Sequence, residues 1–256
     1  MKRFFIPAAL AIIILAACKG NQVAAPTFEQ EILRYDSLID AVYNDTTTSD
    51  DRKDALYRSI LDEMYGSHPS DSIGLYAFKQ LMIDFWDIEE SESQMEKAAP
   101  LISQSIDLQR RLQAKKNAVN QAPGKQFYDL TGPDAIDGHD LTISQFYGQG
   151  KRIIVDFWAS WCSPCRKEIS SHLLDLASDP DYTIVGIAVW EESVEDTRKA
   201  IGELGISWPV IYTGGRENSP SLKYGVTGIP TLFVLDENGT VLGTGHSISS
   251  ILESID

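Results

Sequence analysis

The chain has 256 residues, of which 43% are hydrophobic, and its formal net charge is −15. This length accommodates one to two domains beyond any targeting segment, and the composition is that of an ordinary globular protein. The negative charge argues against a nucleic-acid partner, because phosphates would be repelled rather than neutralised. A solvated acidic surface is the simplest explanation of the charge.

The first 17 residues are predicted to form a lipoprotein signal peptide. Lys2 and Arg3 supply positive charge, and residues 4–15 form an apolar stretch that is too short to span a bilayer core of about 30 Å as a helix. The stretch ends in Leu-Ala-Ala-Cys at 15–18, which resembles the lipobox of bacterial lipoproteins. The resemblance implies cleavage before Cys18, lipid on its sulfur, and an anchor in the bacterial cell envelope that faces the periplasm or the exterior. An uncleaved anchor or an ordinary secretory signal is the alternative.

The chain contains three cysteines. If Cys18 carries lipid, Cys162 and Cys165 remain as an isolated pair, and no framework of structural disulfides is left. The two remaining cysteines therefore indicate a reactive pair rather than a structural disulfide framework.

Residues 27–118 are predicted to form an all-α domain of three to five helices, after a tether at 18–26. Thr27 and Gln30 make a capping-box pattern, and apolar residues then recur at spacings of three and four. Further helices are expected at about 50–65 and 72–88, and from 100 to the basic pair at 115–116. The acidic run at 87–92 is interpreted as a solvated helix end and loop. The domain contains no convincing catalytic constellation, so its function stays open.

Residues 119–256 are predicted to form a mixed α/β domain. Pro123 and Gly124 interrupt the preceding helix, and strands then alternate with helices, which favours a sheet covered by helices. The dipeptide Asn-Gly at 238–239 predicts a hairpin with a type I′ turn. The expected strands are 127–130, 152–157, 183–189, 208–212, 231–235 and 240–243, and the expected helices are 141–146, 168–177, 194–204 and 249–253.

The motif Trp-Cys-Ser-Pro-Cys at 161–165 stands directly behind the apolar strand 152–157. A cysteine at the end of a buried strand and the start of a helix meets unpaired N–H groups and a partial positive charge, which favour the thiolate. Cys162, at an exposed helix start, is expected to attack a partner disulfide, and Cys165, one turn further and better buried, is expected to complete the exchange. Half of a zinc site is the competing interpretation, but zinc needs two more ligands and His172 is the one histidine nearby.

Three segments carry a family resemblance: Pro-Gly-Lys at 123–125, the block from 155 to 165, and Gly-Ile-Pro-Thr at 228–231. By these, residues of about 122–256 resemble the thioredoxin superfamily, and more closely its membrane-anchored TlpA/ResA-like thiol-disulfide oxidoreductases. The resemblance implies a thioredoxin-like fold, in which helices flank a mixed central sheet, and a redox disulfide between Cys162 and Cys165. It implies no cofactor and no metal.

The same resemblance implies partners and a direction of reaction. Disulfide-containing exported proteins are the expected substrates, reduction is the preferred direction, and a membrane electron donor is expected to recharge the pair. Oxidase or isomerase activity stays open. So does a different class of function, in which the helical domain binds partners and the thioredoxin-like domain serves for docking.

Further site residues are carried over by position. Pro230 matches the family's cis-proline, a trans proline at an edge strand being the alternative. The preceding Ile229 is expected to pair with the substrate backbone, and Trp161 is expected to supply apolar surface for the substrate.

Three carboxylates follow or belong to the strands around the motif. Asp156 matches a buried carboxylate that assists proton transfer to the second cysteine, and burial would raise its pKa; a solvated aspartate at a strand end is the alternative. Glu191 and Glu192 follow the next strand, where some relatives keep an acidic residue, but a plain loop explains them equally well. They are left out of the expected catalytic set.

The lipid anchor gives a direct prediction. A Cys18→Ala variant loses the sulfur that would carry the acyl chains, and stable anchoring needs more than one such chain. We expect this variant in the soluble fraction of cell lysates, measured by fractionation and immunoblotting. A variant that stays with the membranes would contradict the assignment of Cys18.

Overall fold

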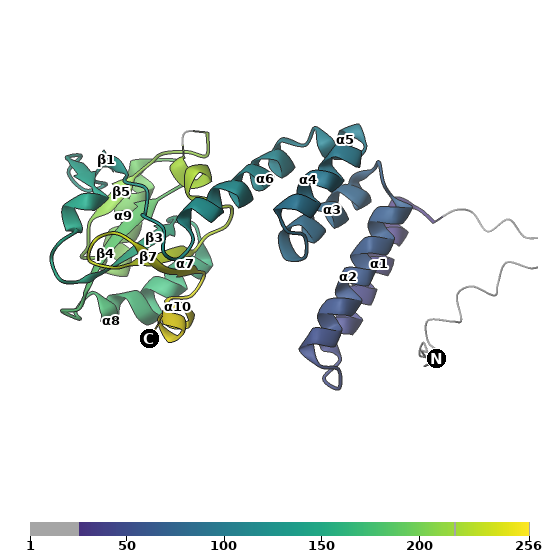
Figure 1. Ribbon diagram of the computed structural model, residues 1–256, viewed down its shortest axis with the longest axis horizontal. Helices are drawn as coiled ribbons and strands as arrows, with labels where there is room; N and C mark the ends of the chain where they lie inside the picture. Colours follow the sequence, from purple (N-terminus) through teal and green to yellow (C-terminus); the bar gives the residue numbers. More distant parts are fainter. Residues whose placement is uncertain (1–25, 218, 256) are drawn as a thin grey trace, which may run out of the picture.

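The computed structural model describes residues 26–217 and 219–255, arranged as a helical part at residues 28–118 and a sheet-containing part at residues 119–255 (Figure 1). The predicted signal peptide at 1–17, Cys18 and most of the tether at 18–26 lie outside the described residues. Over the described ranges, no helix has the length and apolar character needed to cross a membrane.

The helical part is built from helices that bury one shared apolar core. Phe78 lies at its centre, where its ring meets that of Trp86 edge to face with centroids 4.8 Å apart, and the hydrophobic effect on such side chains supplies about 1.5–3 kcal/mol each. The core also contains Leu61, Leu81 and Leu108. The helices are α1 (Phe28–Asn44), α2 (Asp50–Ser67), α3 (Ser72–Asp84), α4 (Ile88–Lys97), α5 (Pro100–Ser103) and α6 (Ile106–Ala118).

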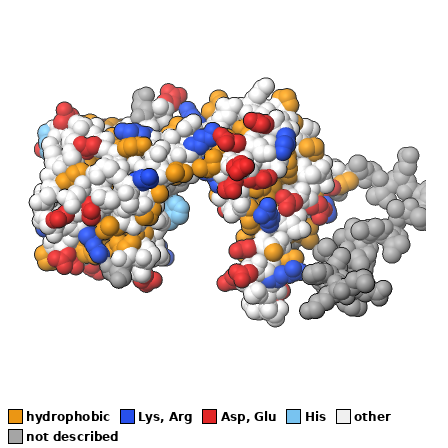
Figure 2. Space-filling view, in the orientation of Figure 1, with side chains coloured by type: hydrophobic (Ala, Val, Ile, Leu, Met, Phe, Trp, Pro, Cys, Tyr) orange, Lys and Arg blue, Asp and Glu red, His pale blue; other side chains and the backbone are white. Residues whose placement is uncertain are grey.

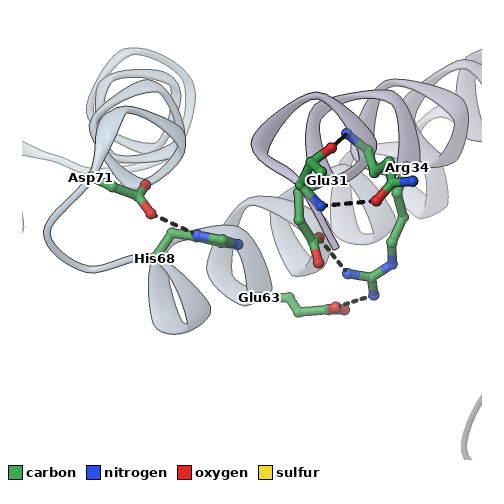
Figure 3. Close-up of polar contacts among 7 residues, drawn as sticks. Glu31, Arg34, Glu63, His68 and Asp71 are labelled. Carbon is green, nitrogen blue, oxygen red and sulfur yellow. Dashed lines mark hydrogen bonds and ion pairs between the residues drawn. The ribbon is translucent and has the colours of Figure 1, made fainter. Parts of the chain in front are cut away.

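Helix α1 begins with the predicted capping box. The N–H of Gln30 donates to Thr27 Oγ1 at 3.3 Å, and Gln30 Oε1 accepts from the N–H of Thr27 at 2.9 Å. Further along α1, the Arg34 guanidinium donates to Glu31 at 3.3 Å and to Glu63 of α2 at 2.6 Å (Figure 3). Exposed ion pairs contribute at most about 1 kcal/mol, so this bridge aligns α1 with α2 while the core supplies most of the stability.

Three expectations about this part are wrong in detail. The helix expected at 72–88 ends at Asp84, and the acidic run starts α4 instead of forming a loop. The Asp87 carboxylate accepts from the N–H of Glu90 at 2.8 Å, and acidic side chains in a first turn are favoured by the helix dipole. The helix expected from 100 to 116 is broken after α5, because Ser105 caps a new helix, α6.

The sheet-containing part has a five-stranded mixed sheet in the order β5-β4-β3-β6-β7. Strand β3 lies at its centre, parallel to β4 and antiparallel to β6, and the parallel pair β4–β5 and antiparallel pair β6–β7 complete it. The strands are β3 (Arg152–Trp158), β4 (Tyr182–Ala188), β5 (Val210–Tyr212), β6 (Thr231–Leu235) and β7 (Val241–Gly245), and β1 (Thr131–Pro133) pairs separately with β2 (Asp140–Thr142). The predicted α/β fold, with helices before it, is confirmed.

Each face of the sheet carries its own apolar core, as the two-residue period of a strand requires. Ile154 and Trp158 of β3 face one core, which they share with the long helices of this part. Ile153, Val155 and Phe157 face the other core, which is closed by short segments such as η4 (Pro220–Tyr224). The helices on the first face are α7 (Ser163–Glu168), the π-turn Ile169–Leu173, α8 (Leu174–Leu176), α9 (Val194–Leu204) and α10 (Ile248–Ile255).

Local expectations failed where tertiary contacts decide the backbone. Residues 127–130 form no strand, because Phe127 instead buries its ring beside Tyr224, and β1 starts at Thr131. The hairpin β6–β7 exists, but its turn is not type I′, since Gly239 has φ +86° while Asn238 has no positive φ. It is a three-residue loop closed by Asp236 and Thr240, with glycine at the left-handed position. Helix formation at 141–146 is limited to the 3₁₀ turn Ile143–Phe146.

The two parts meet where α6 ends against η4. The Asn117 side chain donates to the carbonyl of Leu222 at 2.8 Å. Gly225 has φ +75°, and a Cβ built there would lie 2.6 Å from the Cβ and 2.7 Å from the Cα of Ala118. Glycine therefore permits both the left-handed turn after η4 and the close approach of the two backbones.

Substituting this glycine tests the junction. Gly225→Ala is expected to lower the free energy of unfolding by ~2–4 kcal/mol, because a left-handed conformation and a contact with backbone atoms are both unfavourable for a Cβ. Urea unfolding of the full chain measures the change. The control Gly66→Ala, in α2 with nothing within 4 Å of its new Cβ, is expected to raise stability by ~0.5–1 kcal/mol. Equal stability of both variants would contradict the close contact between Gly225 and Ala118.

Candidate functional site

Cys162 and Cys165 form a disulfide at the point where the central strand passes into a helix. Strand β3 ends at Trp158, and Cys162 is the N-cap of α7. Its Sγ accepts from the N–H of Cys165 at 3.2 Å, and its carbonyl accepts from the N–H of Arg166 at 3.0 Å. One cysteine thus serves as helix cap and as half of the disulfide, whose Cα atoms are 5.3 Å apart.

The disulfide is more deeply buried than the sequence indicates. Cys162 is only 4% exposed and Cys165 is 0% exposed, so the expectation of an exposed Cys162 is wrong, although it remains the more accessible of the two. The neighbouring Trp161 is 53% exposed. Trp161 is thus exposed at the surface, while the Cys162 sulfur beside it lies below the surface.

A cis peptide bond joins Ile229 to Pro230 beside this disulfide. The Ile229 carbonyl oxygen lies 3.7 Å from Cys162 Sγ, a van der Waals contact, because a disulfide sulfur carries no proton to donate. His246 Nδ1 lies 2.6 Å from the Pro230 carbonyl oxygen, and the Thr231 hydroxyl donates to the Gly228 carbonyl at 2.8 Å. These contacts fix the conformation of the loop that lies against the sulfur.

Asp156 is buried on the central strand β3, with 1% of its surface exposed. It lies between Ile154 and Trp158 on β3, so by the alternation of the strand it faces the core that contains Cys165. Burial, followed by repulsion from Glu168, raises its pKa to about 8. Its Oδ1 has no hydrogen-bond partner among the described residues. The alternative of a solvated carboxylate is therefore wrong.

Glu168 was missed by the sequence reasoning. It lies one helical turn after Cys165, at the end of α7, and its Oε1 accepts from the N–H of Ile248 at the start of α10 with a distance of 2.7 Å. The i+3 spacing from Cys165 was the available signal, since residues three apart share a helix face. Its contact with α10 depends on tertiary structure and left no trace in the local pattern.

Glu191 is a second residue whose importance the sequence did not reveal. It is 3% exposed, and its carboxylate accepts from the N–H of Ser160 at 2.6 Å and from the Ser160 hydroxyl at 2.7 Å. Burial raises the pKa of Glu191, although the bonds from Ser160 oppose that shift. The plain-loop interpretation is wrong for Glu191, because its side chain holds the turn that leads into Cys162.

Trp190 connects this turn to a neighbouring surface. It is the one non-glycine residue with positive φ, 59°, in the described ranges, a conformation that is unfavourable for a bulky side chain. Its carbonyl accepts from Trp161 Nε1 at 3.0 Å, and its own Nε1 donates to the Ser221 hydroxyl at 3.1 Å. The exposed Trp161 ring is thereby oriented by a strained residue of the next loop.

The comparison with family models decides the classification. The Redoxin model matches residues 104–250, which is more than half of the chain. The chain belongs to the Redoxin family. The match confirms the predicted thioredoxin-like class, and it includes helix α6, which the sequence analysis assigned to the helical domain.

Relatives of this redoxin carry oxidoreductase names. The chain is 27% identical over 137 residues to thiol-disulfide oxidoreductase ResA of Geobacillus thermodenitrificans, covering 49% of this chain and 76% of the relative. It is 36% identical over 94 residues to thiol:disulfide interchange protein HelX of Rhodobacter capsulatus, covering 36% of this chain and 51% of the relative. A solved thioredoxin domain of a thiol-disulfide oxidoreductase from Bacteroides vulgatus matches 53% of this chain and 99% of its own, at 25% identity and a TM-score of 0.45. The predicted enzyme class, a thiol-disulfide oxidoreductase, is supported by the family.

The raised pKa of Asp156 predicts a pH dependence of stability. The unfolded carboxyl ionises near its ordinary value of 3.8, whereas the folded one stays protonated to about 8. Between these values the folded state holds the extra proton, so stability falls as pH rises, by up to about 1.4 kcal/mol per pH unit. Asp156→Asn cannot ionise and should remove most of this slope.

Urea unfolding of the oxidised protein at pH 5, 6 and 7 measures the slope. The control Asp40→Asn removes an exposed carboxylate of α1 and should leave the slope unchanged. Parallel pH profiles for Asp156→Asn and the parent chain would contradict the buried, protonated aspartate.

Proposed function

We propose that this redoxin reduces disulfide bonds of exported proteins through its Cys162–Cys165 pair. One observation carries the proposal: the more accessible sulfur of the buried Cys162–Cys165 disulfide caps a helix, and the Ile229–Pro230 loop lies against it. A helix N-terminus stabilises a thiolate, and the adjacent backbone offers a place for an extended polypeptide.

The reaction starts from the reduced pair. The Cys162 thiolate attacks one sulfur of a substrate disulfide, forms a mixed disulfide and releases the other substrate sulfur as a thiolate that takes up a proton. The Cys165 thiolate then attacks Cys162 Sγ, closes the intramolecular disulfide and releases the second substrate thiol. Two electrons pass from the cysteine pair to the substrate, and the oxidised pair is the state that the structure contains.

The second step requires Cys165 to lose its proton in a buried environment. Asp156 faces the same core as Cys165, and Glu168 lies one turn beyond it on the helix. A carboxyl group whose pKa is about 8 exchanges protons readily near neutral pH, which is what a general base in this position requires. We assign Asp156 this role and Glu168 the role of a positioning residue that sets the charge around it.

Substrate binding is assigned to Ile229, Pro230 and Trp161. The Ile229 backbone lies next to the reacting sulfur, so a substrate strand paired with it would bring its own disulfide to Cys162. The exposed Trp161 ring would cover the apolar part of that strand. Neither contact needs a cofactor.

The setting of the reaction is proposed from the N-terminal residues. A signal peptide at 1–17 and lipid on Cys18 would hold the protein at the bacterial cell envelope, facing the periplasm or the exterior, where disulfides of exported proteins occur. A membrane electron donor would then reduce the pair after each turnover.

Trapping with Cys165→Ser tests the function. This variant keeps the attacking thiol but lacks the second one, so it should accumulate mixed disulfides with client proteins, visible on non-reducing gels and absent after dithiothreitol treatment. Cys162→Ser should lower reduction of insulin to the uncatalysed rate. Persistent turnover by Cys162→Ser would show that the nucleophile is assigned wrongly.

The double variant with serine at both positions separates enzyme from binding module. Clients that the double variant retains as well as the parent chain does would favour binding by the helical part. A measured reduction potential of the pair distinguishes reduction from oxidation, because the more oxidising potentials of this fold suit an oxidase.

A further inference from the structure

A cavity of about 370 Å³ lies between helix α6 and the sheet-containing part. One wall is the first half of α6, with Asp107, Arg110 and Arg111, and the opposite wall includes Trp190, Arg216 and Thr227. Ligand cavities start at about 300 Å³, so this volume suits one or two side chains of a bound polypeptide rather than a large cofactor.

The lining of the cavity has three arginines and two acidic residues, in a chain whose net charge is −15. Arg110, Arg111 and Arg216 line it together, and basic side chains are visible where α6 meets the sheet-containing part (Figure 2). Asp107, which also lines the cavity, is already engaged by Arg111 at 3.1 Å and by Lys79 at 2.9 Å. Since Arg111 is itself paired with Asp107, Arg110 and Arg216 remain with a single acidic residue in the lining, Glu217.

Arg216 is held in place by an aromatic ring. Its guanidinium carbon lies 4.5 Å from the centre of the Trp190 ring, a cation–π arrangement that orients the side chain and leaves its N–H groups available. Guanidinium groups bind carboxylates in a bidentate manner with strong, charge-assisted hydrogen bonds. The lining is therefore suited to carboxylates.

The cavity is connected to the redox site by two short links. Trp190 accepts a hydrogen bond from Trp161, the residue before Cys162, at 3.0 Å. Thr227 lies two residues before Ile229, whose carbonyl touches the Cys162 sulfur. A polypeptide chain that lies along Ile229 can therefore extend directly into the cavity.

We propose that this cavity binds acidic side chains of the substrate polypeptide that flank its disulfide. The inference rests on the proposed function for the identity of the ligand as a substrate. Helix α6, which belongs to the helical part, would then help to select substrate disulfides that are flanked by acidic residues.

Binding of cysteine-free peptides tests the cavity independently of turnover. The probes are an extended ten-residue peptide with four Glu residues and its counterpart with four Gln residues, each titrated into the oxidised full chain by calorimetry at low salt. One added charge-assisted pair corresponds to about a tenfold change in Kd, so the Glu peptide should bind at least about tenfold more tightly. Arg110→Gln combined with Arg216→Gln should reduce this preference to within about twofold.

The matched control removes two guanidinium groups outside the cavity. Arg52→Gln with Arg58→Gln changes the net charge equally, on the exposed surface of α2, and should keep the preference. Equal binding of the Glu and Gln peptides by the parent chain, or loss of the preference in the control, would overturn the inference. The inference would also be overturned if the chain bound anionic lipid vesicles while it bound the Glu and Gln peptides equally well.

Kinetics with disulfide-bonded versions of both peptides then separates the two proposals. A higher kcat/KM for the acidic peptide, lost in the cavity variant, supports both. Selective binding of the acidic peptide with no reduction of either disulfide would reject the reductase function while supporting the cavity as an acidic-peptide site.

Discussion

The chemistry of this protein depends on where the central strand β3 stops. Both edges of β3 are hydrogen-bonded, to β4 on one side and β6 on the other, so its end is fixed in space by the whole sheet. Cys162 follows only four residues later and caps the next helix. Because backbone groups at a helix N-terminus are unpaired and partly positive, the fold places this sulfur where a thiolate would be stabilised.

Buried polar groups around the disulfide work against stability. Asp156 lies in the apolar core, and one of its oxygens lacks a hydrogen-bond partner among the described residues. Glu191 is buried and accepts hydrogen bonds from Ser160. Each carboxyl loses hydration, which costs free energy unless it is protonated or hydrogen-bonded. Glu191 offsets this cost through two hydrogen bonds from Ser160, which also fix the turn before Cys162. Asp156 offsets it by staying protonated. The first arrangement positions the turn before Cys162, and the second keeps a protonated carboxyl group in the core that contains Cys165.

Sequence reasoning succeeded where one local signal dominates. The continuous apolar run of β3, the capping box at Thr27 and the paired cysteines each specify their own structure within a few residues. It failed where distant residues decide: Asn238 adopts no positive φ because the loop register sets the turn, and Glu168 reaches α10, which lies 80 residues further along the chain. The site was therefore found from its motif, while the residues that support the site became visible only in three dimensions.

Helix α6 has a part in both halves of the molecule. Leu108 near its start is buried in the helical core, and Ala118 at its end packs against Gly225. The Redoxin match, which begins at residue 104, includes this helix, although the local pattern assigns it to the helices before it. A helix that is packed at both ends is more rigid than a flexible linker. The arginines of α6 are therefore held at a defined distance from Trp190 and the disulfide. The helical part thus contributes one wall of the cavity beside Trp190.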